Sequence, residues 1–103
     1  MDIATLSARA VAVNRLYVEA FGVERDGLFL LGKLSEEAGE VAGAYLKLHG
    51  RARGSDAAPD ALRADLAAEM ADLLGFLLCL AAEEGVDLAT AFEEKWGRYL
   101  EAP

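Results

Sequence analysis

Two short acidic motifs, one in each half of the chain, limit what this sequence can fold into. The first pairs Glu37 with Glu40 and the second pairs Glu69 with Asp72, and in each the two acids stand three residues apart. Residues at i and i+3 share one side of a helix, so each motif predicts a helix that presents two carboxylates. The fold must therefore supply two such helices and a place for four acids.

At about 100° per residue, each acidic pair lies beside an apolar stripe. The stripe of the first helix contains Leu34, Val41, Tyr45 and Leu48, and that of the second contains Leu62, Leu66, Leu73 and Leu80. Glu37 is predicted on the shoulder of the first stripe and Glu69 inside the second. Helices that pack through these stripes would bring the four carboxylates together at the edge of the core. Buried, unpaired carboxylates are costly, and a hard divalent cation such as Mg²⁺ removes that cost.

Hydrophobic periodicity and the positions of glycine and proline predict an all-α chain. The expected helices span about residues 3–21, 28–49, 59–84 and 87–100, and glycine-rich, charged loops cover 22–27 and 50–58. No segment shows sustained alternation with a period of two, so we predict no strand. We expect a single domain of residues 1–103 with a four-helix bundle-type fold.

Alanine-rich helices with narrow leucine stripes form a thin bundle. A lone four-helix chain of 103 residues should therefore leave apolar surface exposed. We predict that homo-oligomerisation completes the fold, as a homodimer or a homotetramer in which the long second and third helices build the shared core.

The net charge limits the classes of molecule that the protein can bind, and the cysteine content limits its disulfides and its location. The net charge of −8 argues against a nucleic-acid polymer or an anionic membrane as the main partner. It does not argue against a nucleotide, because a bound metal ion reverses the local sign of charge. The single cysteine, Cys79, excludes an intrachain disulfide and is expected to be buried. These features, and an N-terminus without a signal-peptide pattern, predict a cytoplasmic protein.

The whole pattern resembles the all-α nucleoside triphosphate pyrophosphohydrolases, and most closely their MazG-like branch. Glu-Glu-x-x-Glu occurs at 36–40 and Glu-x-x-Asp at 69–72, and the segments 80–88 and 92–99 are also similar to that branch. The likeness covers roughly residues 28–100. It implies Mg²⁺-dependent hydrolysis, with Mn²⁺ as a substitute, of (d)NTP to monophosphate and pyrophosphate in nucleotide-pool house-cleaning. It also implies a homo-oligomer with sites at subunit contacts.

The resemblance also implies roles for individual residues. The implied metal ligands are Glu37, Glu40, Glu69 and Asp72, and the implied phosphate-binding residues are Lys33, Lys95, Arg98 and Tyr99. Glu36 would be a further ligand or the base that activates water, so Glu36 and Glu37 are the catalytic candidates. Asn14 and Tyr17 are candidates for the base pocket.

Helical spacing and loop composition add two observations to these roles. Glu36 faces away from the apolar stripe, so it reaches the same ion only if the site wraps around the helix or a second chain covers it. Arg51 and Arg53 lie in the loop between the acidic helices and could stabilise the leaving pyrophosphate.

Three alternatives stay open. The chain could be a non-catalytic helical module for nucleotide binding or dimerisation, as its small size suggests. It could be a phosphoribosyl-ATP pyrophosphohydrolase, which we rank lower because those enzymes usually carry Tyr-His where this chain has Gly75-Phe76. Finally, the acids could be a solvated helix shoulder paired with Lys33 or Arg63.

Overall fold

The structure is a computed structural model of the chain and describes residues 1–101. Its elements are α1 (Ile3–Phe21), α2 (Gly27–Leu48), α3 (Pro59–Glu83), α4 (Leu88–Lys95) and the 3₁₀ helix η1 (Gly97–Leu100). The described residues contain no strand, which confirms the all-α prediction. No helix within residues 1–101 has the length and apolarity needed to cross a bilayer.

The helix boundaries follow from local signals in the sequence. The aspartates that precede α1, α2 and α4 each accept a hydrogen bond from a backbone N–H in the first turn; these are Asp2, Asp26 and Asp87. Such N-caps satisfy amide groups that the helix leaves unpaired. Pro59 begins α3, where its missing N–H costs nothing. Gly22 ends α1 with φ +64°, a conformation that other residues rarely adopt.

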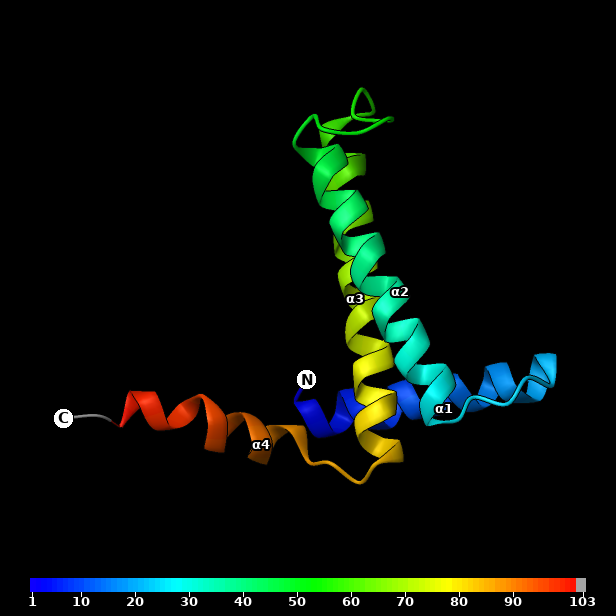
Figure 1. The fold of residues 1–103 in the computed structure, drawn as a ribbon, viewed down its shortest axis with the longest axis vertical. Helices are drawn as coiled ribbons and strands as arrows, with labels where there is room; N and C mark the ends of the chain where they lie inside the picture. Colours follow the sequence, from blue (N-terminus) through cyan, green and yellow to red (C-terminus); the bar gives the residue numbers. More distant parts are fainter. Residues whose placement is uncertain (102–103) are drawn as a thin grey trace.

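The long antiparallel hairpin of α2 and α3 dominates the architecture (Figure 1). α2 packs along α3, and α1 crosses the hairpin at its lower end and packs against α3. After α3 the chain turns and α4 extends away from the hairpin (Figure 1). The radius of gyration is 16.4 Å, whereas a compact domain of this length would have about 13 Å. A single chain therefore forms an open arrangement of helices rather than a closed bundle.

The seam between α2 and α3 follows a seven-residue repeat. On α2 the buried residues are Leu30, Glu37 and Ala44. On α3 the residues with the same spacing are Leu62, which is buried, and Glu69 and Phe76, which are half-buried. A spacing of seven keeps side chains on the partner helix when two helices wind around each other with a left-handed twist. Glu37 thus lies inside the seam, and the prediction that it sits on the shoulder of the stripe is wrong.

Two further details of the sequence prediction need correction. Tyr45 is 54% exposed and does not belong to the packed stripe. The seam winds at about 3.5 residues per turn, so a residue eleven positions after Leu34 has rotated out of it, whereas Leu48, fourteen positions on, has not. The fourth helix is also shorter than predicted: α4 ends at Lys95, and the chain continues as η1 from Gly97, a residue with low helix propensity.

Candidate active site

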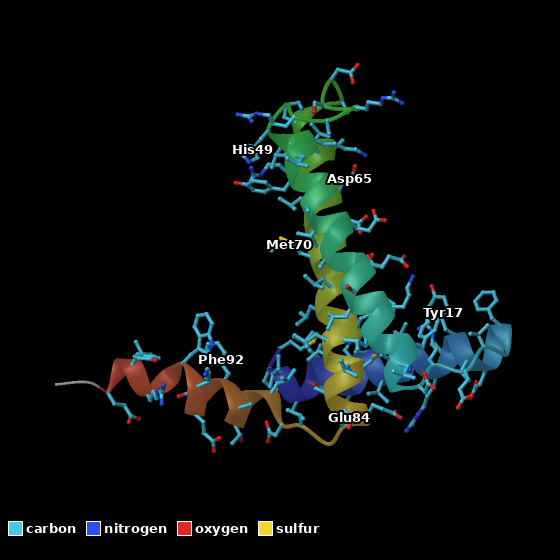
Figure 2. All side chains as sticks on the ribbon, viewed as in Figure 1. Tyr17, His49, Asp65, Met70, Glu84 and Phe92 are labelled. Carbon is cyan, nitrogen blue, oxygen red and sulfur yellow. The ribbon has the colours of Figure 1, made fainter. Side chains whose placement is uncertain are left out.

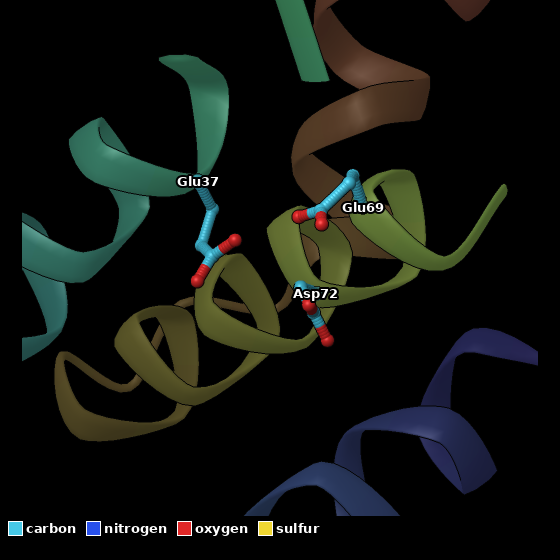
Figure 3. A group of neighbouring side chains, drawn as sticks. All are labelled: Glu37, Glu69 and Asp72. Atoms are coloured by element: carbon cyan, nitrogen blue, oxygen red, sulfur yellow. The ribbon is translucent and has the colours of Figure 1, made fainter. Parts of the chain in front are cut away.

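Three carboxylates lie close together near the middle of the α2–α3 seam (Figure 3). Glu37 extends from α2 toward Glu69 and Asp72 on α3, and one oxygen of each lies within 4.8 Å of the others. The seven-residue repeat explains the meeting of Glu37 and Glu69, because both occupy seam positions near the middle of their helices. Asp72 follows Glu69 by one helical turn and joins them from the edge of the seam.

This cluster carries unfavourable electrostatics in the protein alone. The side chain of Glu37 is 8% exposed. Burial, followed by repulsion from Asp72 and Glu69, raises its pKa above the ordinary 4.5, and Lys33 only partly opposes this. Two negative charges about 5 Å apart repel by roughly 3 kcal/mol at an effective dielectric constant near 20. A cation bound between the carboxylates would offset both the desolvation and the repulsion.

The chemistry of these ligands fits a hard divalent metal ion. All three offer carboxylate oxygens, and they come from two helices that hold them at fixed positions. Mg²⁺ binds in proteins through one or a few carboxylates while keeping several waters or taking substrate phosphates as further ligands. Glu37, Glu69 and Asp72 could therefore hold Mg²⁺, or Mn²⁺ in its place, and still leave ligand positions for a polyphosphate.

The other two acids of the first motif lie outside this cluster. Glu40 is exposed and does not join the three carboxylates. Glu36 is exposed, as its position opposite the stripe predicted, and its Oε1 accepts a hydrogen bond from Lys33 Nζ at 2.9 Å. Roles for Glu36 as base and for Glu40 as ligand stay predictions.

A cavity of about 470 Å³ opens beside the carboxylates. It is lined by Ala10, Val13, Asn14 and Tyr17 of α1, by Arg25, by Lys33 and Glu37 of α2, and by Ala71, Asp72, Gly75, Phe76 and Cys79 of α3. The volume lies within the roughly 300–1,000 Å³ that is usual for small-molecule sites. Three residues predicted for the site, Lys33, Asn14 and Tyr17, line the same cavity as two of the clustered acids. Cys79 is buried, as predicted.

Arg25 is a residue of this cavity that the sequence prediction missed. Its guanidinium lies over three aromatic rings. The distance from Arg25 Cζ to the ring centroid is 4.7 Å for Tyr17, 5.1 Å for Phe29 and 5.6 Å for Phe76. Lys33 Nζ lies 5.7 Å from the Phe76 ring, so two cations flank that side chain. Arg25 directly precedes the N-cap of α2, and a cation just before a helix is a weak sign of a site at that helix end.

The remaining predicted residues lie elsewhere in a single chain. Lys95 lines a different, apolar cavity of about 640 Å³ with Phe92 and Trp96. Arg98 Nη2 donates to Tyr99 Oη at 3.1 Å on η1, beyond the end of α4. Figure 2 shows Phe92 far along α4 from Tyr17, which lies beside the lower end of the hairpin. The structure therefore does not bring these three predicted phosphate contacts to the acid cluster.

The loop arginines are also distant from the carboxylates. Arg51 and Arg53 follow His49, which lies at the tip of the hairpin (Figure 2). Twelve residues separate Glu37 from His49, which corresponds to about 18 Å of helix. A contact between these arginines and a ligand at the acid cluster of the same chain would require the loop to fold back over the hairpin.

The raised pKa of Glu37 predicts an unusual pH dependence of stability. Between the ordinary value of 4.5 and the higher value in the folded chain, the folded state binds more protons at this group than the unfolded state. The free energy of unfolding of cation-free protein should therefore fall as pH rises through that window. Asp2 acts in the opposite sense, but below 3.8, because its hydrogen bond from Thr5 lowers its pKa.

Urea unfolding in a chelator at a series of pH values measures this dependence. Glu37→Gln should flatten the decrease above pH 4.5, because glutamine does not titrate. An unchanged slope in the variant would show that Glu37 is not the group responsible.

Comparison with known families adds one finding. Residues 17–95 match the phosphoribosyl-ATP pyrophosphohydrolase family. The matched span contains the three clustered acids, Arg25 and Lys33. Neither the curated proteins nor the solved structures contain a significant match.

Proposed function

Because the chain belongs to the phosphoribosyl-ATP pyrophosphohydrolase family and is thus a pyrophosphohydrolase, we propose that it hydrolyses nucleoside triphosphates with Mg²⁺. The reaction converts a (d)NTP and water into a (d)NMP and pyrophosphate, and its proposed role is the removal of unwanted nucleotides from the pool. The family match supports the cleavage of a phosphoanhydride between the α and β phosphates. We further propose that the substrate is a simple nucleoside triphosphate and that the chain belongs to the MazG-like branch.

One observation carries this function: a single cavity combines acids that can bind a metal with two cations and aromatic walls. Polyphosphate and clustered carboxylates repel each other, so their contact needs a bridging ion. Lys33 supplies positive charge in the cavity that Glu37 and Asp72 line, and Tyr17 and Phe76 provide apolar surface for the nucleoside. A solvated helix shoulder would not enclose such a cavity or bury Glu37.

The residues of the cavity divide into three tasks. Glu37, Glu69 and Asp72 would hold the metal ion, which, when bound, neutralises phosphate charge and makes water more acidic. Lys33 lines the cavity and is placed to bind a phosphate oxygen, and its ammonium also donates a hydrogen bond to the exposed Glu36. That hydrogen bond also raises the pKa of Lys33, so the side chain stays charged at neutral pH. The proton of the attacking water would pass to Glu36 or Glu37.

Phosphoribosyl-ATP is the second candidate substrate, and the family match favours it. It carries the same triphosphate, so the acid cluster could serve either substrate in the same way. The difference lies in a second phosphorylated sugar on the base, which would have to fit at the α1 side of the cavity. There Gly75 and Phe76 line the wall in place of the Tyr-His pair that is usual in that family.

A substrate panel tests the proposal. The protein is incubated with Mg²⁺ and the common ribo- and deoxyribonucleoside triphosphates, and separately with phosphoribosyl-ATP, and pyrophosphate and orthophosphate are measured separately. We expect monophosphate and pyrophosphate from at least one simple triphosphate, and much less from Glu69→Gln. Turnover of phosphoribosyl-ATP alone would support the second candidate. Tight nucleotide binding without any product would support a non-catalytic module.

We also propose that the functional form is a homodimer or homotetramer. Large apolar side chains on α3, on α4 and at the end of α4 are exposed in one chain, and they include Met70, Phe92 and Trp96 at 55%, 57% and 66%. Burying such surface in a second copy would be favourable and would allow Lys95, Arg98 and Tyr99 of one chain to approach the acids of another. Light scattering after size-exclusion chromatography should give at least twice the mass of 11.0 kDa, and a monomer at micromolar concentration would contradict this.

A further inference from the structure

A hydrogen bond between the α1–α2 loop and α1 joins two polar side chains in the wall of the cavity. Arg25 Nη1 donates to Asn14 Oδ1 at 2.8 Å in a partly buried position. The three aromatic rings around the guanidinium restrict its movement, and both residues line the cavity. Arg25 and Asn14 therefore form a restrained pair in the wall of the cavity that Glu37 and Asp72 also line.

The chemistry of this pair determines which way the asparagine amide points. An arginine side chain can only donate hydrogen bonds, so Asn14 must direct its oxygen toward Arg25. The amide nitrogen of Asn14, with two hydrogens, is then the group left to contact a ligand. The remaining guanidinium N–H groups are donors too. This part of the cavity wall thus offers hydrogen-bond donors.

The cavity has room for a nucleobase next to this pair. Its α3 wall includes two small residues one turn apart, Ala71 and Gly75, beside Asp72, Phe76 and Cys79. A Cβ added at Gly75 would have no neighbouring heavy atom within 4 Å among residues 1–101, which shows open space. Asn14, Lys33, Glu37 and Asp72 line this same cavity, so one bound nucleotide could contact all four side chains.

Building on the proposed function, we propose that the Asn14–Arg25 pair selects triphosphates whose base presents a carbonyl rather than an amino group. A carbonyl oxygen accepts a hydrogen bond from the Asn14 amide, whereas an amino group would place donor against donor and leave both without a partner. The favoured substrates are those of hypoxanthine and uracil, and the disfavoured ones are those of adenine and cytosine. Asn14 is the residue that touches the base, and Arg25 is a positioning residue that sets the direction of the amide.

Two matched pairs of substrates test this selection. ITP and ATP exchange carbonyl for amino on the same purine, and UTP and CTP do so on the same pyrimidine. Because the cavity is open on one side, we expect kcat/KM to favour the carbonyl member by about 10- to 100-fold, less than a fully enclosed site achieves. A ratio near one in both pairs would overturn the proposal.

Two variants separate this role from a general contact with phosphate. Asn14→Asp keeps the shape and still accepts from Arg25, but it replaces the donor with an acceptor, so the preference should reverse toward ATP and CTP. Arg25→Gln can donate or accept, so the amide of Asn14 is no longer held in one direction and both ratios should fall toward one. If Arg25→Gln instead lowers kcat/KM equally for all four substrates, Arg25 binds phosphate and the proposal is wrong.

Binding of monophosphates distinguishes this inference from the proposed function. Calorimetry with IMP and AMP in the presence of Mg²⁺ reports base preference without turnover, because a monophosphate has no phosphoanhydride to cleave, and we expect IMP to bind at least several-fold more tightly. If no triphosphate yields pyrophosphate but IMP is still preferred, the proposed function fails and the inference about the base stands. If phosphoribosyl-ATP is hydrolysed and neither monophosphate is preferred, the inference fails and pyrophosphohydrolase activity stands.

Discussion

Replacing Glu37 with glutamine is expected to lower kcat/KM for pyrophosphate release by about 100-fold or more while raising the stability of the cation-free protein. Loss of a group that merely supports a metal ligand already costs roughly 10- to 100-fold, and Glu37 is placed as a ligand itself. Glutamine has nearly the same shape but no charge, so it removes the desolvation and repulsion that raise the pKa of Glu37. Activity and thermal unfolding, each with and without Mg²⁺, measure both effects.

The two effects of this substitution together distinguish a functional acid from a structural one. If Glu37 served only to stabilise the fold, its replacement would lower activity and stability together. We expect instead that Mg²⁺ stabilises the parent protein, and that it stabilises the variant much less. Asp65→Asn is a matched control, because it removes one exposed negative charge from α3 outside the cluster and should leave activity unchanged. Full activity in Glu37→Gln would show that the cluster does not hold the catalytic ion.

Replacing Leu30 with alanine is expected to destabilise the protein by about 2–5 kcal/mol, the usual cost of a large cavity in a core. Leu30 is 1% exposed, and it lies one heptad before Glu37 in the seam of the hairpin. In a domain of this size the loss corresponds to a decrease in Tm of roughly 10 °C or more. Chemical denaturation, followed by helical circular dichroism, gives the free energy of unfolding.

Leu28→Ala provides the comparison on the same helix. Leu28 is 81% exposed, so the same chemical change should alter the free energy of unfolding by only about 0.5 kcal/mol or less. A loss at Leu28 as large as that at Leu30 would mean that an assembled form buries Leu28, and repeating the denaturation at several protein concentrations would reveal this. Small losses at both positions would contradict the packing of the hairpin described above.

The acids of the seam explain why activity and stability oppose each other in this protein. A seven-residue series of apolar side chains would give a stable hairpin, yet the middle position of each helix is occupied by Glu37 or Glu69. These acids weaken the packed seam of the protein alone and fix the position of a charge cluster on two rigid helices. The open cavity beside them, lined in part by alanine and glycine, also weakens the packing of the helices.

The sequence by itself determined the local structure and the identity of the acids. Aspartates before the helices, Pro59 and Gly22 specify boundaries through hydrogen bonds and dihedral preferences within a few residues, and the predicted start of α1 and α3 agrees with the structure. The two acidic pairs were visible for the same reason, because i and i+3 spacing is a property of one helix.

The tertiary structure alone decided which acids meet and what else joins them. The winding of α2 around α3 moves Glu37 into the seam and leaves Glu40 outside the cluster, and it excludes Tyr45 from the core. Arg25 comes from a loop, whose path is set by how α1 crosses the hairpin and not by its own neighbours in sequence. Periodicity fixes the face of an isolated helix, whereas the angle and phase at which helices pack depend on contacts between distant segments.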